Sequence, residues 1–233
     1  MKLLSLIILS LIAGSIHAGS IRFSPVTIQL VGDEPATSIN LYNQGNDESN
    51  LQVRIFKWVQ ENGQDTLQET NDVVVSPPFV NLAANSSYNV RIVRISPTEI
   101  SQEKSYRILI DELPKPIDNR KVNQSLNILL RSSLPLFITN PNSIAEVHWS
   151  IQQDSNNQSY LVLNNTGNRH LLMGKLVIED TTIHVSYPIQ VNTVNGYILA
   201  KEMKSYKVDN SVNLSNGHKY ILSMILNGKL VNL

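Results

Sequence analysis

Hydrophobic and polar residues alternate along most of this chain, in short runs that are separated by turns. Alternation with a period of two places the apolar side chains on one face of a β-strand. Almost no stretch has the periodicity of a helix. Many short strands joined by turns are typical of an all-β antiparallel sandwich. In the first part of the chain we expect strands at residues 21–30, 37–42, 51–59, 73–82, 88–95 and 106–113.

The longest alternating run covers residues 125–141. Leu126, Ile128 and Leu130 begin an apolar parity that continues to Leu136, which predicts a long strand with one apolar face. A typical strand has about five or six residues. A long apolar edge strand promotes aggregation, and a protein that keeps one can use it to pair with a partner chain by strand addition. The pattern by itself favours a strand buried in its own sandwich, and both interpretations stay open.

A turn of sequence Asn-Pro-Asn-Ser at residues 140–143 interrupts the pattern. We place a domain boundary there, with a first domain at residues 19–141 and a smaller second domain at residues 142–233. The second part contains eight more short runs and several Asn-Gly pairs, which favour hairpin turns. It is therefore predicted to form another β-sandwich.

The first 18 residues have the features of a signal peptide: Lys2 supplies a positive start, an apolar core follows, and small residues precede a cleavage site after Ala18. No later segment approaches the roughly 20 apolar residues that a membrane-spanning helix needs. We therefore expect a mature chain that starts at Gly19 and is soluble outside the cytoplasm. The chain has no cysteine, so its domains must be stabilised by their apolar cores rather than by disulfides.

The composition offers little for catalysis or for cofactors. The formal net charge is zero, which gives no overall attraction to nucleic acid or to anionic membranes. Cysteine nucleophiles are absent, the histidines of the mature chain lack metal-site spacing, and no nucleophile elbow or phosphate-binding glycine loop occurs. Asp111 and Glu112 are adjacent on a strand and so point to opposite faces, which makes a poor acid–base pair. We expect no enzyme, no metal site and no cofactor.

Arginines on three expected strands are candidates for binding an anion. These are Arg91, Arg94, Arg107 and Arg131, and some of their guanidinium groups could converge if those strands share a sheet. Guanidinium groups bind carboxylates through two parallel hydrogen bonds. The alternative is a solvated strand face with scattered charge.

Three segments, SSYNVRIVRISP, SYRILIDELPKP and LNILLRSSLPLFITNP, stand in an order and spacing that resemble one known family. The chain is similar along nearly all of its mature length to the periplasmic pilus-assembly chaperones of the chaperone–usher pathway. The resemblance implies two immunoglobulin-like domains in an L-shaped arrangement. It also implies donor-strand complementation, in which the chaperone lends a strand to a pilus subunit until an outer-membrane usher releases that subunit. Leu126, Ile128 and Leu130 would be the side chains that fill the groove of the subunit.

The sequence departs from the well-known branch of that family at the site that grips the C-terminal carboxylate of the subunit. The two basic positions correspond to Thr27 and Pro135, and neither is charged. The chain therefore looks more like the archaic or alternative branch, which carries a proline at the lysine position. Our hypothesis is that Arg131, helped by Arg107 or Arg94, replaces the missing pair.

The resemblance carries two further expectations and leaves alternatives. Glu112 matches the glutamate that lies between the domains in the family, although Asn227 stands where an acidic partner is usual. A free copy could cap its own strand by self-association.

The alternatives are a secreted two-domain adhesin or pilus structural component, and a carbohydrate-binding module. A pilus subunit usually has one domain and often a cysteine pair, and a carbohydrate-binding module needs more aromatic residues than the 6% present here.

Overall fold

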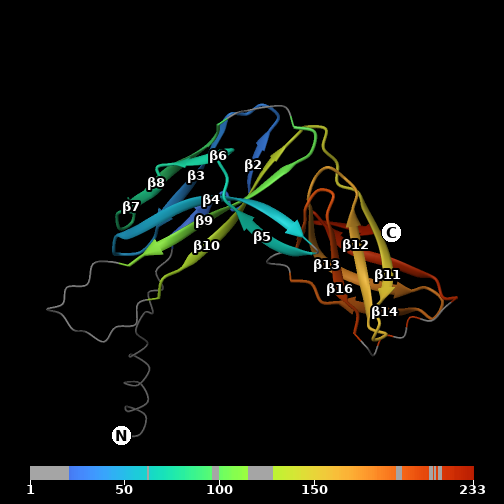
Figure 1. Ribbon diagram of the computed structural model, residues 1–233. Helices are drawn as coiled ribbons and strands as arrows, with labels where there is room; N and C mark the ends of the chain where they lie inside the picture. Colours follow the sequence, from blue (N-terminus) through green and yellow to red (C-terminus); the bar gives the residue numbers. More distant parts are fainter. Residues whose placement is uncertain are drawn as a thin grey trace, which may run out of the picture.

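The computed structural model describes residues 21–61, 63–95, 100–114, 128–192, 196–209, 212, 214 and 217–233. Every regular element in this part of the chain is a β-strand, so the expected all-β class is confirmed. Two sandwiches meet at an angle and form the expected L shape (Figure 1). The expected signal peptide and the side chain of Leu126 lie outside the described residues.

The first sandwich is made of a four-stranded and a six-stranded sheet. The smaller sheet has the order β1 (Ile21–Ser24), β3 (Ala36–Asn43), β8 (Ser87–Arg94) and β6 (Val73–Ser76). The larger sheet has the order β2 (Ile28–Val31), β10 (Arg131–Thr139), β9 (Lys104–Leu113), β4 (Ser49–Glu61) and β5 (Gln64–Gln68), with β7 (Phe79–Leu82) also paired to β4. The chain passes from one sheet to the other between β1 and β2, where Pro25 interrupts the apolar pattern of the expected strand at residues 21–30.

Strand β9 shows how the sequence divides the two faces of the larger sheet. Tyr106, Ile108 and Ile110 are fully buried in the core between the sheets. Burial of an aliphatic side chain contributes about 1.5–3 kcal/mol to folding, which fixes the parity of the strand. Arg107 and Asp111 have the opposite parity and therefore lie on the outer face. This outer face carries the charged groups of the candidate site.

The second sandwich has its own core. One sheet contains β11 (Val147–Gln153), β12 (Ser159–Asn165) and β16 (Met203–Lys207). The other has the order β14 (Val185–Ile189), β13 (Leu171–Asp180), β17 (Tyr220–Leu226) and β18 (Lys229–Asn232), and β15 (Tyr197–Ile198) pairs with β13. In the described part of the chain, no helix is long and apolar enough to span a membrane.

An aromatic cluster joins the two sandwiches. Trp58 of β4 and Phe137 of β10 pack with Tyr197 and Leu199 of the second sandwich. The ring centroids of Trp58 and Tyr197 are 5.4 Å apart in an edge-to-face arrangement. Such aromatic pairs contribute beyond the area that they bury, so the cluster holds the angle between the sandwiches.

Polar groups surround this cluster and also cross the joint. The carboxylate of Glu103, whose side chain is fully buried, accepts a hydrogen bond of 2.9 Å from the backbone N–H of His170. The same carboxylate oxygen lies 2.7 Å from Nδ1 of the His170 ring. That ring stacks on Phe137 with 3.7 Å between ring centroids. Glu103 therefore links the start of β9 directly to the second sandwich.

Candidate functional site

Strand β10 is paired along nearly its whole length on one edge and along only about half of its length on the other. Its antiparallel partner β9 pairs with residues 131–138. Its parallel partner β2 pairs only with residues 136–139. Within the described residues, no strand pairs with residues 131–135 on that second edge. The first half of β10 therefore has an open margin.

Two hydrogen bonds fix which backbone groups face the open margin. The N–H of Glu112 on β9 donates to the carbonyl oxygen of Leu130 at 2.9 Å. At the other end of β10, the N–H of Gly32 after β2 donates to the carbonyl oxygen of Thr139, also at 2.9 Å. Because successive residues of a strand direct their backbone groups to opposite edges, even-numbered residues face β9. The N–H and C=O groups of Arg131 and Ser133 therefore face the open margin.

The residues before β10 expose three consecutive large apolar side chains. The exposed fractions are 70% for Ile128, 50% for Leu129 and 52% for Leu130. Leu130 also lines, with Phe23 of β1, a small hollow of about 50 Å³ at the end of the first sandwich. Further along the same run, Leu136 is fully buried in its own core. The predicted long apolar strand is thus divided, with an exposed beginning and a buried end.

A charged cluster lies on the outer face beside this margin. Asp111 of β9 stands opposite Arg131 of β10 in the register, and its carboxylate accepts a hydrogen bond from Nε of Arg131. The other carboxylate oxygen lies 2.6 Å from a guanidinium nitrogen of Arg54 on β4. The hydrogen bond from Arg131 lowers the pKa of the Asp111 carboxyl, and the bond from Arg54 lowers it further against the opposing effect of burial. Two guanidinium groups share one carboxylate, so the cluster keeps one net positive charge.

The three arginines that are candidates for the anchor, Arg94, Arg107 and Arg131, do not come together in the structure. Arg94 is on β8, which belongs to the other sheet, and its guanidinium donates to the carbonyl oxygen of Gly32 at 2.7 Å. Arg107 is 8% exposed, its guanidinium carbon lies 3.7 Å from the ring centroid of Trp58, and burial lowers its pKa. Both side chains are therefore committed to packing within the protein. Arg131 is the one member of the expected set that lies beside the open margin, with 63% of its side chain exposed.

Arg54 is the second cation of the cluster, and it was not among the arginines predicted to bind an anion. Its even parity on the run at residues 51–59 places it on the outer face, and this could be read from the sequence. Its proximity to Asp111 depends on the pairing of β4 with β9, in which Leu109 stands opposite Arg54. No local pattern specifies that register.

The expectation that Glu112 lies between the domains is wrong for this structure. Glu112 stands opposite Leu51 near the end of β9, and its N–H bonds to Leu130. The contacts across the joint come from the other end of that strand, where Glu103 meets His170. An antiparallel strand of ten residues spans about 30 Å, so the two ends of β9 cannot serve the same contact.

The two positions that carry basic residues in the well-known branch of the family, Thr27 and Pro135, each lie directly before the parallel ladder, which begins where Leu136 of β10 pairs with Ile28 of β2. Pro135 is also opposite Arg107 on β9. Neither Pro135 nor Thr27 carries a charge, whereas Arg131 directly follows the exposed residues 128–130.

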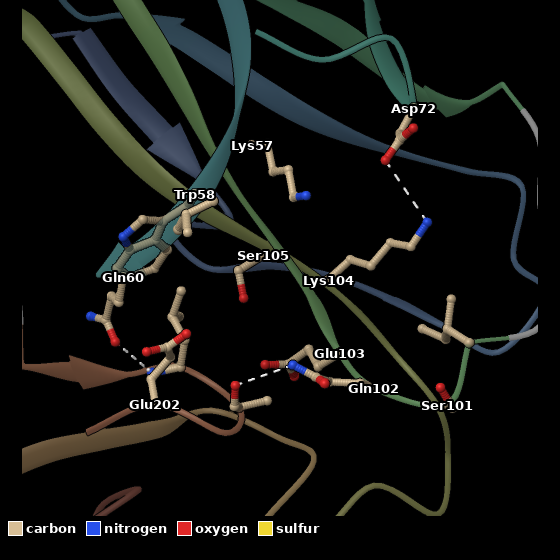
Figure 2. A pocket seen from close by; sticks show the side chains of 14 residues that line it. Lys57, Trp58, Gln60, Asp72, Ser101, Gln102, Glu103, Lys104, Ser105 and Glu202 are labelled. Atoms are coloured by element: carbon tan, nitrogen blue, oxygen red, sulfur yellow. Dashed lines mark hydrogen bonds and ion pairs between the residues drawn. The ribbon is translucent and has the colours of Figure 1, made fainter. Parts of the chain in front are cut away.

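The joint between the sandwiches contains a separate hollow of about 480 Å³, shown in Figure 2. Lys57, Lys104, Glu103 and Glu202 are among its charged lining residues. The ammonium group of Lys104 lies 3.8 Å from the carboxylate of Asp72. Burial, together with the nearby Glu61, raises the pKa of Glu202. In the described residues no group of three or more His, Cys, Asp or Glu side chains is placed to hold a metal ion.

Comparison with known protein families identifies the family to which this chain belongs. Residues 20–145, more than half of the sequence, match the family described as pili and flagellar-assembly chaperone, PapD N-terminal domain. The chain belongs to this family of pilus-assembly chaperones. The family is a non-enzymatic class, and the match favours a chaperone over an adhesin or a carbohydrate-binding module. A search of the curated proteins finds no match.

Solved structures with this fold include several chaperones. The chaperone–tip adhesion subunit complex CsuC–CsuE, from archaic Csu pili of Acinetobacter baumannii, contains a chain with 21% identity and a TM-score of 0.71; the match covers 92% of this chain and 97% of that one. A Salmonella enterica structure of the SafA pilin with the SafB chaperone matches at 13% identity and a TM-score of 0.65, covering 94% and 98%. The chaperone YadV matches at 16% identity and a TM-score of 0.64, covering 91% and 97%. These likenesses establish the two-sandwich chaperone fold.

Proposed function

We propose that this protein is a periplasmic chaperone that binds, folds and caps pilus subunits by donor-strand complementation and delivers them to an outer-membrane usher. The observation that carries the proposal is the open margin of β10 directly after the exposed side chains of residues 128–130. An unpaired strand edge with exposed apolar side chains is an aggregation hazard unless a partner covers it. Strand addition by a subunit that lacks one strand covers both the edge and the side chains.

Two kinds of contact contribute to the free energy of binding a pilus subunit. Ile128 and Leu130 enter the groove of the subunit, and each buried aliphatic side chain contributes about 1.5–3 kcal/mol before the cost of ordering. The backbone groups of Arg131 and Ser133 form hydrogen bonds with the guest strand, and these bonds fix its register. By its parity and by the family resemblance, Leu126 is the third apolar side chain of the set.

A carboxylate anchor is proposed at the cluster of Arg54, Asp111 and Arg131. The cluster has one net positive charge and an exposed Arg131, which suits the C-terminal carboxylate of a subunit. The incoming carboxylate competes with Asp111 for hydrogen bonds from Arg131, so the anchor binds by exchanging one carboxylate partner for another. Arg107 and Arg94 are left out of this proposal because their side chains are buried in other contacts.

The proposal includes the cellular context and the division of the chain. Residues 1–18 act as the signal peptide, residues 19–141 form the chaperone domain with the donor strand, and residues 142–233 form the second domain. The uncharged Thr27 and Pro135 support membership of the archaic or alternative branch. The fold likeness to the chaperone of archaic Csu pili is in keeping with that branch.

The substitution Ile128→Asp tests the donor strand. A charged side chain cannot enter an apolar groove without a large desolvation cost, so the variant should fail to protect a co-expressed pilus subunit from periplasmic degradation. Ile144→Asp is the matched control, because Ile144 is similarly exposed at 66% but lies after β10. The measurement is recovery of the subunit from the periplasm. Equal recovery with Ile128→Asp and with the unmodified chaperone would exclude the donor role.

A further inference from the structure

Pro135 lies where the second edge of β10 changes from open to paired. The next residue, Leu136, is the first that pairs with β2, opposite Ile28. Ser133 is the last residue before Pro135 whose N–H faces the open margin. The change thus takes place at a residue that cannot donate a backbone hydrogen bond.

Because Pro135 is an odd-numbered residue of β10, its missing backbone N–H affects the edge toward β2 and not the ladder with β9. Odd-numbered residues of β10 face the side of β2, as the bond between Gly32 and Thr139 indicates. Pro135 therefore removes a donor from the margin and none from the ladder with β9. A proline at Leu134 or Leu136 would instead interrupt that ladder, and prolines within sheets are confined to edges that need no donor.

The chain before β2 also leaves this margin. If the parallel ladder continued, Thr27 would stand opposite Pro135 and Val26 opposite Leu134. Instead, β2 begins at Ile28, Val26 is 64% exposed, and the preceding strand β1 pairs with β3 in the other sheet. The protein's own strand and the open margin are thus adjacent along one edge of β10, with Pro135 between them.

We propose that Pro135 is a register stop, which ends the part of β10 that a guest strand can pair with. This inference rests on the proposed function. The guest bonds to the backbone of Arg131, beside the cluster of Arg54, Asp111 and Arg131, and to the backbone of Ser133. It meets no donor at residue 135 and its pairing ends there, at the point where Arg107 of β9 stands opposite Pro135. The same missing donor prevents β2 from extending along β10 and occupying the margin. The position that is basic in the well-known branch of the family thus limits the length of pairing here.

The free protein provides the first test, by amide hydrogen exchange at single-residue resolution. The amides of Ser132 and Leu134, which face β9, should exchange at least about tenfold more slowly than those of Arg131 and Ser133, which face the margin. Equal protection of all four amides would mean that the margin is already covered, and would overturn the inference.

The complex with a co-expressed pilus subunit provides the second test. In the unmodified chaperone, the amides of Arg131 and Ser133 should become protected when the subunit binds. In the variant Pro135→Ala, the new amide at residue 135 should also become protected in the complex, by about tenfold or more. If binding leaves Arg131 and Ser133 unprotected, the proposed function fails. If these two become protected but the new amide at 135 does not, only the register stop fails.

A variant that carries a proline earlier in β10 provides an independent test of the register stop. Ser133→Pro places a proline one margin-facing position earlier and leaves the ladder with β9 intact. Loss of one backbone hydrogen bond should weaken subunit binding by about tenfold. Ser133→Ala is the control, since it removes the hydroxyl and keeps the N–H, and it should bind as the unmodified chaperone does. Unchanged binding by a folded Ser133→Pro variant would show that pairing does not extend to this residue and would overturn the inference.

Discussion

The side chain of Gln60 joins the backbone of Leu199, because its Oε1 accepts a hydrogen bond of 2.8 Å from the N–H of Leu199. Its Nε2 donates to the carbonyl oxygen of Tyr197 at 2.9 Å. One glutamine at the end of β4 thereby satisfies two backbone groups of the second sandwich, at a site where Gln60 is only 1% exposed. The same amide group also bonds to Asp65, which accepts from Trp58 as well.

Gln60→Ala should destabilise the joint. The substitution leaves the buried backbone groups of Tyr197 and Leu199 without their partner, and we expect a loss of roughly 2–4 kcal/mol in the free energy of unfolding. Denaturant unfolding measures this loss, and small-angle X-ray scattering reports whether the angle between the sandwiches becomes variable. Gln64→Ala, at an exposed position of β5, is the control. A loss no larger than that of the control would contradict the role of Gln60.

Arg131→Ala should reduce recovery of a co-expressed subunit from the periplasm if the cluster beside β10 anchors a carboxylate. Removal of Arg131 leaves Asp111 paired with Arg54 alone, so the net positive charge is lost. Arg22→Ala removes an exposed arginine from the other sheet and serves as the control. Undiminished recovery with Arg131→Ala would refute the anchor.

Asp111→Asn should change the pH dependence of stability. The pKa of Asp111 is lower in the folded state than in the unfolded chain, mainly because of the hydrogen bond from Arg131. Its contribution is therefore fully present well above the ordinary aspartate pKa of about 3.9 and is lost as the pH falls below it. The variant should be less stable than the unmodified protein at pH 7, and the difference should shrink on acidification. Asp47→Asn, in an exposed loop, is the control, and a difference that is constant with pH would exclude this contribution.

Tyr206→Phe should leave the protein as stable as before, or stabilise it by about 1 kcal/mol. The hydroxyl of Tyr206 is buried and has no hydrogen-bond partner among the described residues. Tyr106→Phe is the contrasting variant, because the hydroxyl of Tyr106 donates to Asp72 at 3.1 Å and its removal should destabilise. Denaturant unfolding at neutral pH compares the two, and a large destabilisation by Tyr206→Phe would contradict the expectation.

Tyr206 should also affect the stability of the protein at alkaline pH. Burial raises the pKa of Tyr206 to about 12, against about 10 in an unfolded chain. Because the folded-state value is the higher one, the stability associated with the neutral hydroxyl is present below about pH 10 and is lost as the pH rises toward 12. Tyr206→Phe should therefore lose less stability than the unmodified protein between pH 9 and pH 11, as thermal unfolding would show. Identical losses would contradict the raised pKa.

The local pattern predicted the elements of the site better than it predicted their partners. Alternation was sufficient to find the run at residues 125–141. The pattern could not say that Leu130 is exposed while Leu136 is buried, since both have the same parity and similar side chains. The two leucines differ because the opposite sheet of the first sandwich covers Leu136 and does not cover Leu130.

The sequence by itself determined the fold class and the strand parities, because a side chain on a strand can face only one of two sides and apolar side chains seek burial. It also carried the family motifs and the uncharged residues at positions 27 and 135. Only the tertiary structure decided that Arg54 and Arg131 share Asp111, that Arg107 packs against Trp58, and that Glu112 lies far from the joint. Those relationships depend on which strands pair and in what register, and that choice is set by burial summed over the whole sandwich rather than by any local stretch.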